Sequence, residues 1–138
     1  MYVLDASVVI KWFVEEEGTP IARKILDGHL KGLYTIVAPD LLIYEVSNVL
    51  RHNSSFPHRV TRHCIASLFD LGLDIVAPLV DVVLPAIKLA YDKNVTFYDS
   101  IYVALAHELG LHYVTADRKL HNKIQPFPRT FLLNDLRL

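Results

Sequence analysis

The chain has 138 residues, of which 52% are hydrophobic and 21% are charged, and its formal net charge is −1. This length allows a core of its own, so we expect a single domain over residues 1–138, and the composition excludes a disordered or low-complexity chain. The near-neutral charge excludes a general polyanion-binding surface, and the lone Cys64 excludes both an internal disulfide and a four-cysteine zinc site.

Five short apolar runs are expected to form β-strands. In chain order they are residues 2–4, 36–38, 75–77, 112–114 and 131–133. The runs are continuous rather than alternating, which is typical of strands that are covered on both faces.

Segments with helical spacing lie between the strands. A helix is expected from Asp40, as its N-cap, to about Arg51, and its apolar side is expected to hold Leu42, Val46, Val49 and Leu50. Another is expected over residues 97–109. Strands that alternate with helices of this length favour a parallel sheet. We therefore predict an α/β fold, a three-layer α/β/α sandwich around a five-stranded parallel sheet.

Two glycines mark the ends of predicted helices. Gly72 and Gly110 each follow a helical segment and precede an apolar strand. Glycine suits the left-handed position just beyond a helix, so we expect both helices to end there.

No segment is expected to enter a membrane. The longest apolar runs, such as residues 101–106, are far shorter than the ~20 residues that span a bilayer. Asp5 interrupts the N-terminal apolar segment at once, unlike a secretory leader. These features predict a soluble, cytoplasmic protein.

Four acidic residues are expected at one edge of the predicted sheet. Asp5 follows the first strand and Asp117 follows the fourth, and ligands of open parallel sheets bind beyond the carboxyl ends of the strands. Glu45 lies at the edge of the apolar stripe of its helix. Asp99 lies in the first turn of the helix over residues 97–109, where it too can face this edge.

Helix capping is an alternative role for three of these acids. Asp5 and Asp117 stand at N-cap positions, and Thr96 with Asp99 fits a capping box. Glu45 has no capping role. We favour a shared site, because four acids from four separate segments would otherwise meet at one edge by coincidence.

Such a group of acids predicts a bound cation. At about 5 Å and an effective dielectric constant near 20, each pair of like charges costs about 3 kcal/mol. Oxygen ligands without cysteine or histidine favour Mg²⁺ or Mn²⁺ over Zn²⁺. An ion of this kind turns a bound water into a nucleophile, so the predicted chemistry is hydrolysis of a phosphodiester.

Four segments together resemble the PIN-domain nucleases, and most of all the VapC-type ribonuclease toxins of prokaryotic toxin–antitoxin pairs. The segments are VLDASVV (3–9), LLIYEVSNVL (41–50), YDSIYVALA (98–106) and VTADRKL (114–120), in the order and spacing of the family. The resemblance covers nearly the whole chain. It implies a Mg²⁺- or Mn²⁺-dependent endoribonuclease, the toxin of such a pair, on the parallel fold already expected.

The resemblance also implies roles for particular residues. Asp5 and Asp99 match the principal metal ligands of the family. Glu45 and Asp117 match the two other catalytic acids, so that all four are candidate catalytic and metal-binding residues.

Two small hydroxyl residues and the expected partners complete what the resemblance implies. Ser7 and Thr115 match positions near the catalytic site, where they orient water or a carboxylate, although both can also be ordinary hydroxyls at helix starts. Family members of this kind usually form homodimers and are inhibited by a VapB-like antitoxin whose tail lies over the catalytic edge. We therefore expect an RNA substrate, an antitoxin partner and a homodimer.

Other functions remain open. The same fold can process RNA or cut DNA without a toxin role, or bind RNA without cutting it, although four intact acids argue against the last. A haloacid-dehalogenase-type phosphatase needs an aspartate where Ser7 stands, and a receiver domain needs Asp40 to end a strand instead of capping a helix. A zinc-protease helix is excluded because His107 and His112 are five residues apart.

Contacts with RNA phosphates are expected from local basic residues. Arg118 and Lys119 have the better claim because they follow Asp117 directly, and Lys11 lies near the first helix. Each can also be an ordinary solvated side chain. Residues 52–63 are least constrained by the family pattern, and further candidates lie in or near this segment: Arg51, Arg59 and Arg62.

Overall fold

The computed structural model describes all 138 residues and contains one five-stranded sheet. All pairs of neighbouring strands are parallel. The strand order is β3-β2-β1-β4-β5, with bounds Tyr2–Leu4 (β1), Ile36–Pro39 (β2), Asp74–Val76 (β3), His112–Thr115 (β4) and Thr130–Leu132 (β5).

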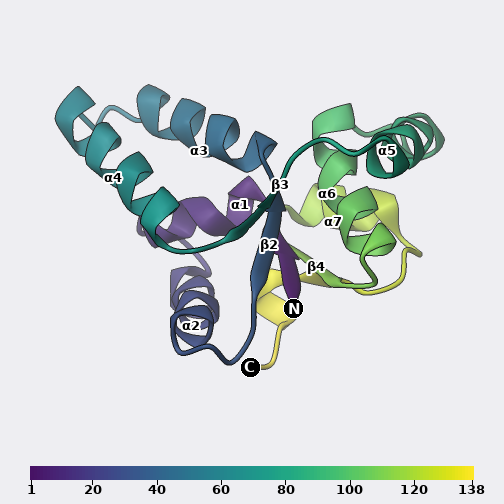
Figure 1. Ribbon diagram of the computed structural model, residues 1–138, viewed down its shortest axis with the longest axis horizontal. Helices are drawn as coiled ribbons and strands as arrows, with labels where there is room; N and C mark the ends of the chain where they lie inside the picture. The colour runs from purple at the N-terminus through teal and green to yellow at the C-terminus, as the bar shows by residue number, and fades with distance from the viewer.

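Seven α-helices flank this sheet. They are α1 (Ala6–Val9), α2 (Thr19–Leu30), α3 (Leu41–His52), α4 (His58–Asp70), α5 (Val80–Lys93), α6 (Phe97–Glu108) and α7 (Arg118–Ile124). Short 3₁₀ turns, η1 and η2, lie at Ile10–Trp12 and Leu133–Asp135. Figure 1 shows α2, α3 and α4 on one side of the sheet and α5, α6 and α7 on the other. The predicted α/β/α sandwich is confirmed.

The sheet topology creates a switch point beside the central strand. The chain leaves β1 towards β2 and β3 on one side, and later returns to the other side to form β4 and β5. Leu4 lies in register with Val114, so the residues that follow β1 and β4 come out side by side. Ligands of open α/β sheets bind at such a switch point.

Helix α6 is the central helix of the core. Every residue from Ser100 to Ala106 is buried, because α6 packs between the sheet and α5. A helix that is apolar all round is expected in such a place. This explains the longest apolar run of the sequence. None of the helices combines the length and the apolar character required to cross a membrane.

Some expected details are wrong at the edge of the sheet. The third and fifth strands each begin one residue earlier than predicted, at Asp74 and Thr130. Asp74 and Ile75 of β3 are exposed, so this strand is not covered on both faces. The reason is that β3 packs mainly against β2, whereas the other edge strand, β5, also packs against α7.

The expectations for α3 are wrong in two details. Val49 is 45% exposed, because the buried side of α3 centres on Leu42, Val46 and Leu50. Asp40 precedes α3, but its side chain makes no capping hydrogen bond. Its backbone is already helical (φ −58°, ψ −24°), whereas a capping side chain needs an extended backbone.

The glycine predictions are confirmed. Gly72 has φ +69° and Gly110 has φ +65°, and each directly follows the last residues of a helix. Both adopt the left-handed conformation that glycine tolerates at no steric cost.

Candidate active site

Asp5 lies at the centre of the switch point and is almost fully buried. Its Oδ1 accepts hydrogen bonds from the amide of Ser7 (3.0 Å) and from Ser7 Oγ (2.5 Å), and its Oδ2 accepts one from the hydroxyl of Tyr113 (2.6 Å). Asp5 therefore does cap α1, as the capping alternative predicted. Burial raises the pKa of Asp5, and the hydrogen bonds only partly oppose this rise.

Ser7 and Thr115 link the ends of β1 and β4. Because the hydroxyl hydrogen of Ser7 points to Asp5, its oxygen accepts from the amide of Ala116 (2.8 Å) and lies 3.3 Å from Thr115 Oγ1. Thr115 Oγ1 in turn accepts from the amide of Asp117 (3.0 Å). The two small hydroxyls thus hold the strand ends together around Asp5.

Glu45 reaches the same region from α3. The hydroxyl of Tyr102, on α6, donates to Glu45 Oε2 at 2.5 Å and joins the two helices. Burial raises the pKa of Glu45, the Tyr102 hydrogen bond lowers it, and the charges of Asp5 and Asp99 raise it further. Asp5 and Asp99 are therefore close enough for their charges to act on Glu45.

Asp99 and Asp117 face a shared hollow of about 410 Å³. The amide of Asp99 donates to Thr96 Oγ1 (3.0 Å), which is one of the two bonds of the predicted capping box. The second bond is not formed, because the Asp99 carboxylate accepts no hydrogen bond from the protein. Asp117 caps α7 by accepting from the amide of Leu120 (2.9 Å). Capping therefore leaves the Asp99 carboxylate free to face the hollow.

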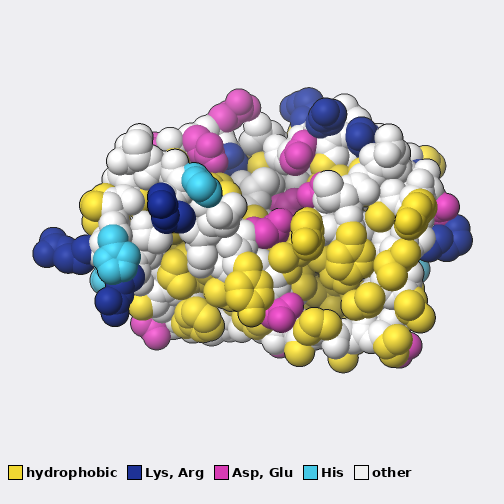
Figure 2. All heavy atoms as spheres, turned by 90° about the horizontal axis from the view of Figure 1, so that it is seen from above, with side chains coloured by type: hydrophobic (Ala, Val, Ile, Leu, Met, Phe, Trp, Pro, Cys, Tyr) yellow, Lys and Arg dark blue, Asp and Glu magenta, His cyan; other side chains and the backbone are white.

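The basic candidates differ in how they are placed. Lys119 lines the hollow that contains Asp99 and Asp117, whereas Arg118 lines a neighbouring hollow together with Lys11. Lys11 is buried and forms a salt bridge with Glu16 at 3.0 Å. Figure 2 shows acidic side chains around a hollow in the upper middle of this face, with Lys and Arg side chains along its rim.

The four acids fit a hard divalent cation by their chemistry. No three of them converge closely enough to hold one ion as a set in this structure. None of the four is paired with a lysine or arginine, since the salt bridges of the chain involve other acids. A buried carboxylate without a cationic partner is costly, and Asp5 is such a group. Carboxylate oxygens are the ligands that Mg²⁺ prefers in proteins.

The sequence reasoning missed two tyrosines of this site, Tyr102 and Tyr113. Both are about 1% exposed, and both hydroxyls donate to a candidate catalytic acid. One signal was available, because a tyrosine within a buried apolar run needs a hydrogen-bond partner for its hydroxyl.

Comparisons with known proteins agree with this fold. Residues 2–124 match the PIN domain, so the chain belongs to the PIN-domain family. It is 30% identical over 125 residues to "Ribonuclease VapC3" of Pyrobaculum aerophilum, and this match covers 88% of this chain and 92% of that relative.

Two solved structures share the fold. The crystal structure of PAE2754 from Pyrobaculum aerophilum has a TM-score of 0.69 and 21% identity, and the match covers 96% of this chain and 89% of that one. A toxin–antitoxin complex from Klebsiella pneumoniae contains a chain with a TM-score of 0.73 and 14% identity, with 99% and 100% covered.

Asp5→Asn is expected to stabilise the metal-free protein. The raised pKa means that the folded state binds the Asp5 proton more tightly than the unfolded state does, so stability falls as pH rises from the ordinary carboxyl pKa through the raised one. Asparagine carries no ionisable proton, so the variant does not lose stability in this way as pH rises. We expect its melting temperature in EDTA to exceed the wild-type value near neutral pH by a few degrees, where roughly 3–5 °C corresponds to 1 kcal/mol. The difference should shrink towards about pH 4. A variant that melts well below wild type at neutral pH would contradict this expectation.

Proposed function

We propose that residues 1–138 act as a single PIN-like nuclease domain that hydrolyses RNA phosphodiesters with Mg²⁺ or Mn²⁺, as the toxin of a toxin–antitoxin pair. The observation that carries the proposal is the arrangement of four carboxylates from separate segments around the ends of β1 and β4, none with a cationic partner. The similarity to a relative named as a ribonuclease supports RNA as the substrate.

Asp99 and Asp117, which line one hollow, are the first proposed ligands of the ion. Asp5 and Glu45 would complete the site by moving towards the ion, because no three of the acids converge without it. When bound, a divalent ion activates water and stabilises the charge that develops on the phosphate oxygens. Ser7 fixes the orientation of Asp5 through two hydrogen bonds, and Thr115 supports Ser7 from β4.

Three basic residues are proposed to contact the RNA backbone beside the scissile bond. Lys119 is placed best, because it lines the hollow of Asp99 and Asp117. Arg118 and Lys11 line the adjacent hollow, although Lys11 is held in place by its salt bridge with Glu16. A phosphate between the two hollows would be within the positive field of all three side chains.

An antitoxin of the VapB type is the proposed protein partner. The fold is shared with a chain from a solved toxin–antitoxin complex, which supports this assignment. The partner would cover the acidic hollow with basic side chains and so exclude the metal and the RNA. Because its substrate is RNA, we propose the cytoplasm as the place of action.

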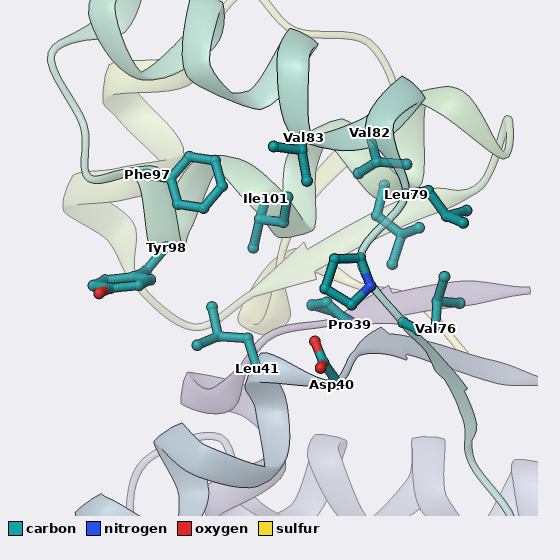
Figure 3. Close-up of a pocket in the computed structure, with 13 residues that line it drawn as sticks. Pro39, Asp40, Leu41, Val76, Leu79, Val82, Val83, Phe97, Tyr98 and Ile101 are labelled. Carbon is teal, nitrogen blue, oxygen red and sulfur yellow. The ribbon is translucent and has the colours of Figure 1, made fainter.

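A homodimer is proposed through an apolar groove between α3, α5 and α6. Figure 3 shows Leu41, Leu79, Val83 and Phe97 lining this groove. Leu79 is 48% exposed, and Val80 beside it is 65% exposed. Figure 2 shows a broad apolar surface on the right half of the molecule, and exposed apolar surfaces of this kind mark interaction sites.

Charge placed in the groove is expected to separate the dimer. Leu79→Lys combined with Val80→Lys should convert a dimer to a monomer in light-scattering measurements of molar mass. Leu33→Lys is the control, because Leu33 is 72% exposed and lies outside the groove. A double variant that keeps the wild-type molar mass would place the dimer interface elsewhere, and a monomeric wild-type protein would contradict the homodimer itself.

The proposed activity is tested by incubating the purified protein with RNA in the presence of Mg²⁺, Mn²⁺ or EDTA. We expect cleavage with either metal, none in EDTA, and recovery when Mg²⁺ is added in excess. Expression without an antitoxin should arrest growth. Cleavage that persists in EDTA would contradict the metal-dependent mechanism, and cleavage without growth arrest would assign the chain to RNA processing instead.

A further inference from the structure

The end of α3 and the whole of α4 form an arm that carries only positive charge along most of its length. No Asp or Glu occurs in residues 46–69, which contain three arginines and three histidines. The arginines give this segment a charge of +3, and since the whole chain has −1, the remaining residues carry −4. This segment therefore has a net charge opposite in sign to that of the rest of the chain.

The positive charge of residues 46–69 is accessible to a binding partner. Arg51, Arg59 and Arg62 are all exposed, and none of them forms a salt bridge. Figure 1 places α4 at the left end of the molecule, and Figure 2 shows Lys, Arg and His side chains gathered at that end. Exposed basic groups without acidic neighbours of their own create a field that attracts polyanions.

The charges share one side of α4. At 100° per residue, His58, Arg59, Arg62 and His63 fall within an arc of about 140°, roughly opposite the buried Leu68. All four are exposed. The helix therefore packs against the body with one side and presents on the other a stripe that is basic up to Asp70, the acid that ends α4 within the same arc.

An exposed aromatic ring lies on the same stripe. Phe69 is 65% exposed and falls within the arc defined by the basic residues. It lies about 10 Å along the helix axis from Arg62, at a rise of 1.5 Å per residue. Basic side chains that track phosphates, together with an aromatic ring on which a base can stack, are the typical elements of a surface for single-stranded nucleic acid.

A hollow connects the candidate active site to the base of this arm. Ser7 and Asp117 line it at the catalytic end, and Val49 and Asn53 line it where α3 ends. The connection from Asn53 leads directly into α4. A strand of RNA that leaves the carboxylates through this hollow would reach the basic stripe.

We propose that the outer side of α4, with Arg59, Arg62 and Phe69, binds single-stranded RNA beyond the scissile bond. The proposal rests on the ribonuclease function proposed above and adds a second contact region to it. The two arginines bind backbone phosphates, and Phe69 stacks on a base. The surface thus increases affinity for long substrates and takes no part in the chemical step.

The test measures binding of a fluorescent single-stranded RNA of about 20 nucleotides by anisotropy, at several salt concentrations in EDTA. All variants carry Asp99→Asn so that the RNA stays intact. Arg59→Ala with Arg62→Ala should weaken binding at low salt by about tenfold or more, and should reduce the slope of log K against log salt by about 1.4, since each phosphate contact contributes about 0.7 for single strands. Phe69→Ala should weaken binding by about tenfold and leave the slope unchanged.

A matched control separates this surface from a general effect of charge. Lys24→Ala with Lys31→Ala removes the same charge from exposed positions at α2 and should leave affinity nearly unchanged. Melting temperatures show whether each variant is folded. With the catalytic acids intact, the α4 variants should cleave a trinucleotide at the wild-type rate and long RNA more slowly.

Four results would overturn the proposal. If the α4 variants and the α2 control weaken binding equally, the effect is one of net charge alone. If the α4 variants bind RNA normally but lose affinity for a protein antitoxin, the surface belongs to that partner. If the wild-type protein cleaves RNA while the α4 variants bind RNA normally, the proposed α4 surface is wrong and the ribonuclease function stands. If the wild-type protein neither binds nor cleaves RNA, both the α4 surface and the ribonuclease function are contradicted.

Discussion

Asp99→Asn is expected to abolish RNA cleavage and to leave the fold intact. The Asp99 carboxylate accepts no hydrogen bond from the protein, so asparagine removes a negative charge from the hollow without breaking a structural contact. Removing one group that stabilises charge in a catalytic site typically costs about 10²–10³-fold in rate, and the loss of a metal ligand should cost at least as much. Initial rates on a defined RNA with saturating Mg²⁺, together with circular dichroism, measure both effects.

The control for this variant is Asp81→Asn. Asp81 is an exposed acid in the first turn of α5, just as Asp99 lies in the first turn of α6, but it is outside the hollow. We expect the control to keep wild-type activity. Full activity in the Asp99 variant would remove Asp99 from the catalytic group.

Tyr113→Phe is expected to reduce both metal affinity and the cleavage rate by about 10–100-fold, the usual cost of losing a group that orients a metal ligand. The hydroxyl of Tyr113 is the hydrogen-bond donor to Asp5 Oδ2, and without it this buried oxygen has no partner. An unsatisfied buried acceptor costs about 1–3 kcal/mol, so the variant should also unfold at a lower temperature. Titration with Mn²⁺, followed by electron paramagnetic resonance, measures the affinity independently of cleavage.

Tyr34→Phe is the control for Tyr113→Phe. Its hydroxyl donates to the carbonyl of Lys24 at 3.3 Å, away from the acids, so Mn²⁺ affinity should be unchanged. Tyr102→Phe should act in the same direction as Tyr113→Phe through Glu45, with a smaller effect because Glu45 is only half-buried. If Tyr113→Phe lowers stability but binds Mn²⁺ like wild type, the tyrosine supports the fold alone.

The sequence predicted the fold, and the end of the sheet where the four acids lie, because both depend on local patterns. A parallel sheet brings the carboxyl ends of its strands to one edge, so an acid directly after β1 and another just after β4 must come close once the strands are identified. Asp5 and Asp117 are placed by this rule alone. Glu45 and Asp99 followed from helical periodicity, which also located the two helices.

The hydrogen-bond partners of the acids were beyond such reasoning. Tyr102 and Glu45 are 57 residues apart, and Tyr113 and Asp5 are 108 apart, so no local pattern connects them. The exposure of β3 depends on which elements pack against it, which is a property of the tertiary structure and not of its own residues. The basic stripe of α4 could be identified only by combining the absence of acids over residues 46–69 with the side of α4 that is buried in the structure.

The most direct test of the account is the location of a bound Mn²⁺ ion by anomalous X-ray scattering from a crystal soaked in Mn²⁺. We predict one or two peaks among the four acids, at the carboxyl ends of β1 and β4, with carboxylate oxygens of Asp5 and Asp99 at about 2.0–2.3 Å from an ion. The same soak of the Asp99→Asn protein should give a weaker peak or none. An ion bound elsewhere, or a hollow that stays free of Mn²⁺ at saturating concentration, would contradict the claim that these distant carboxylates form one metal-dependent site.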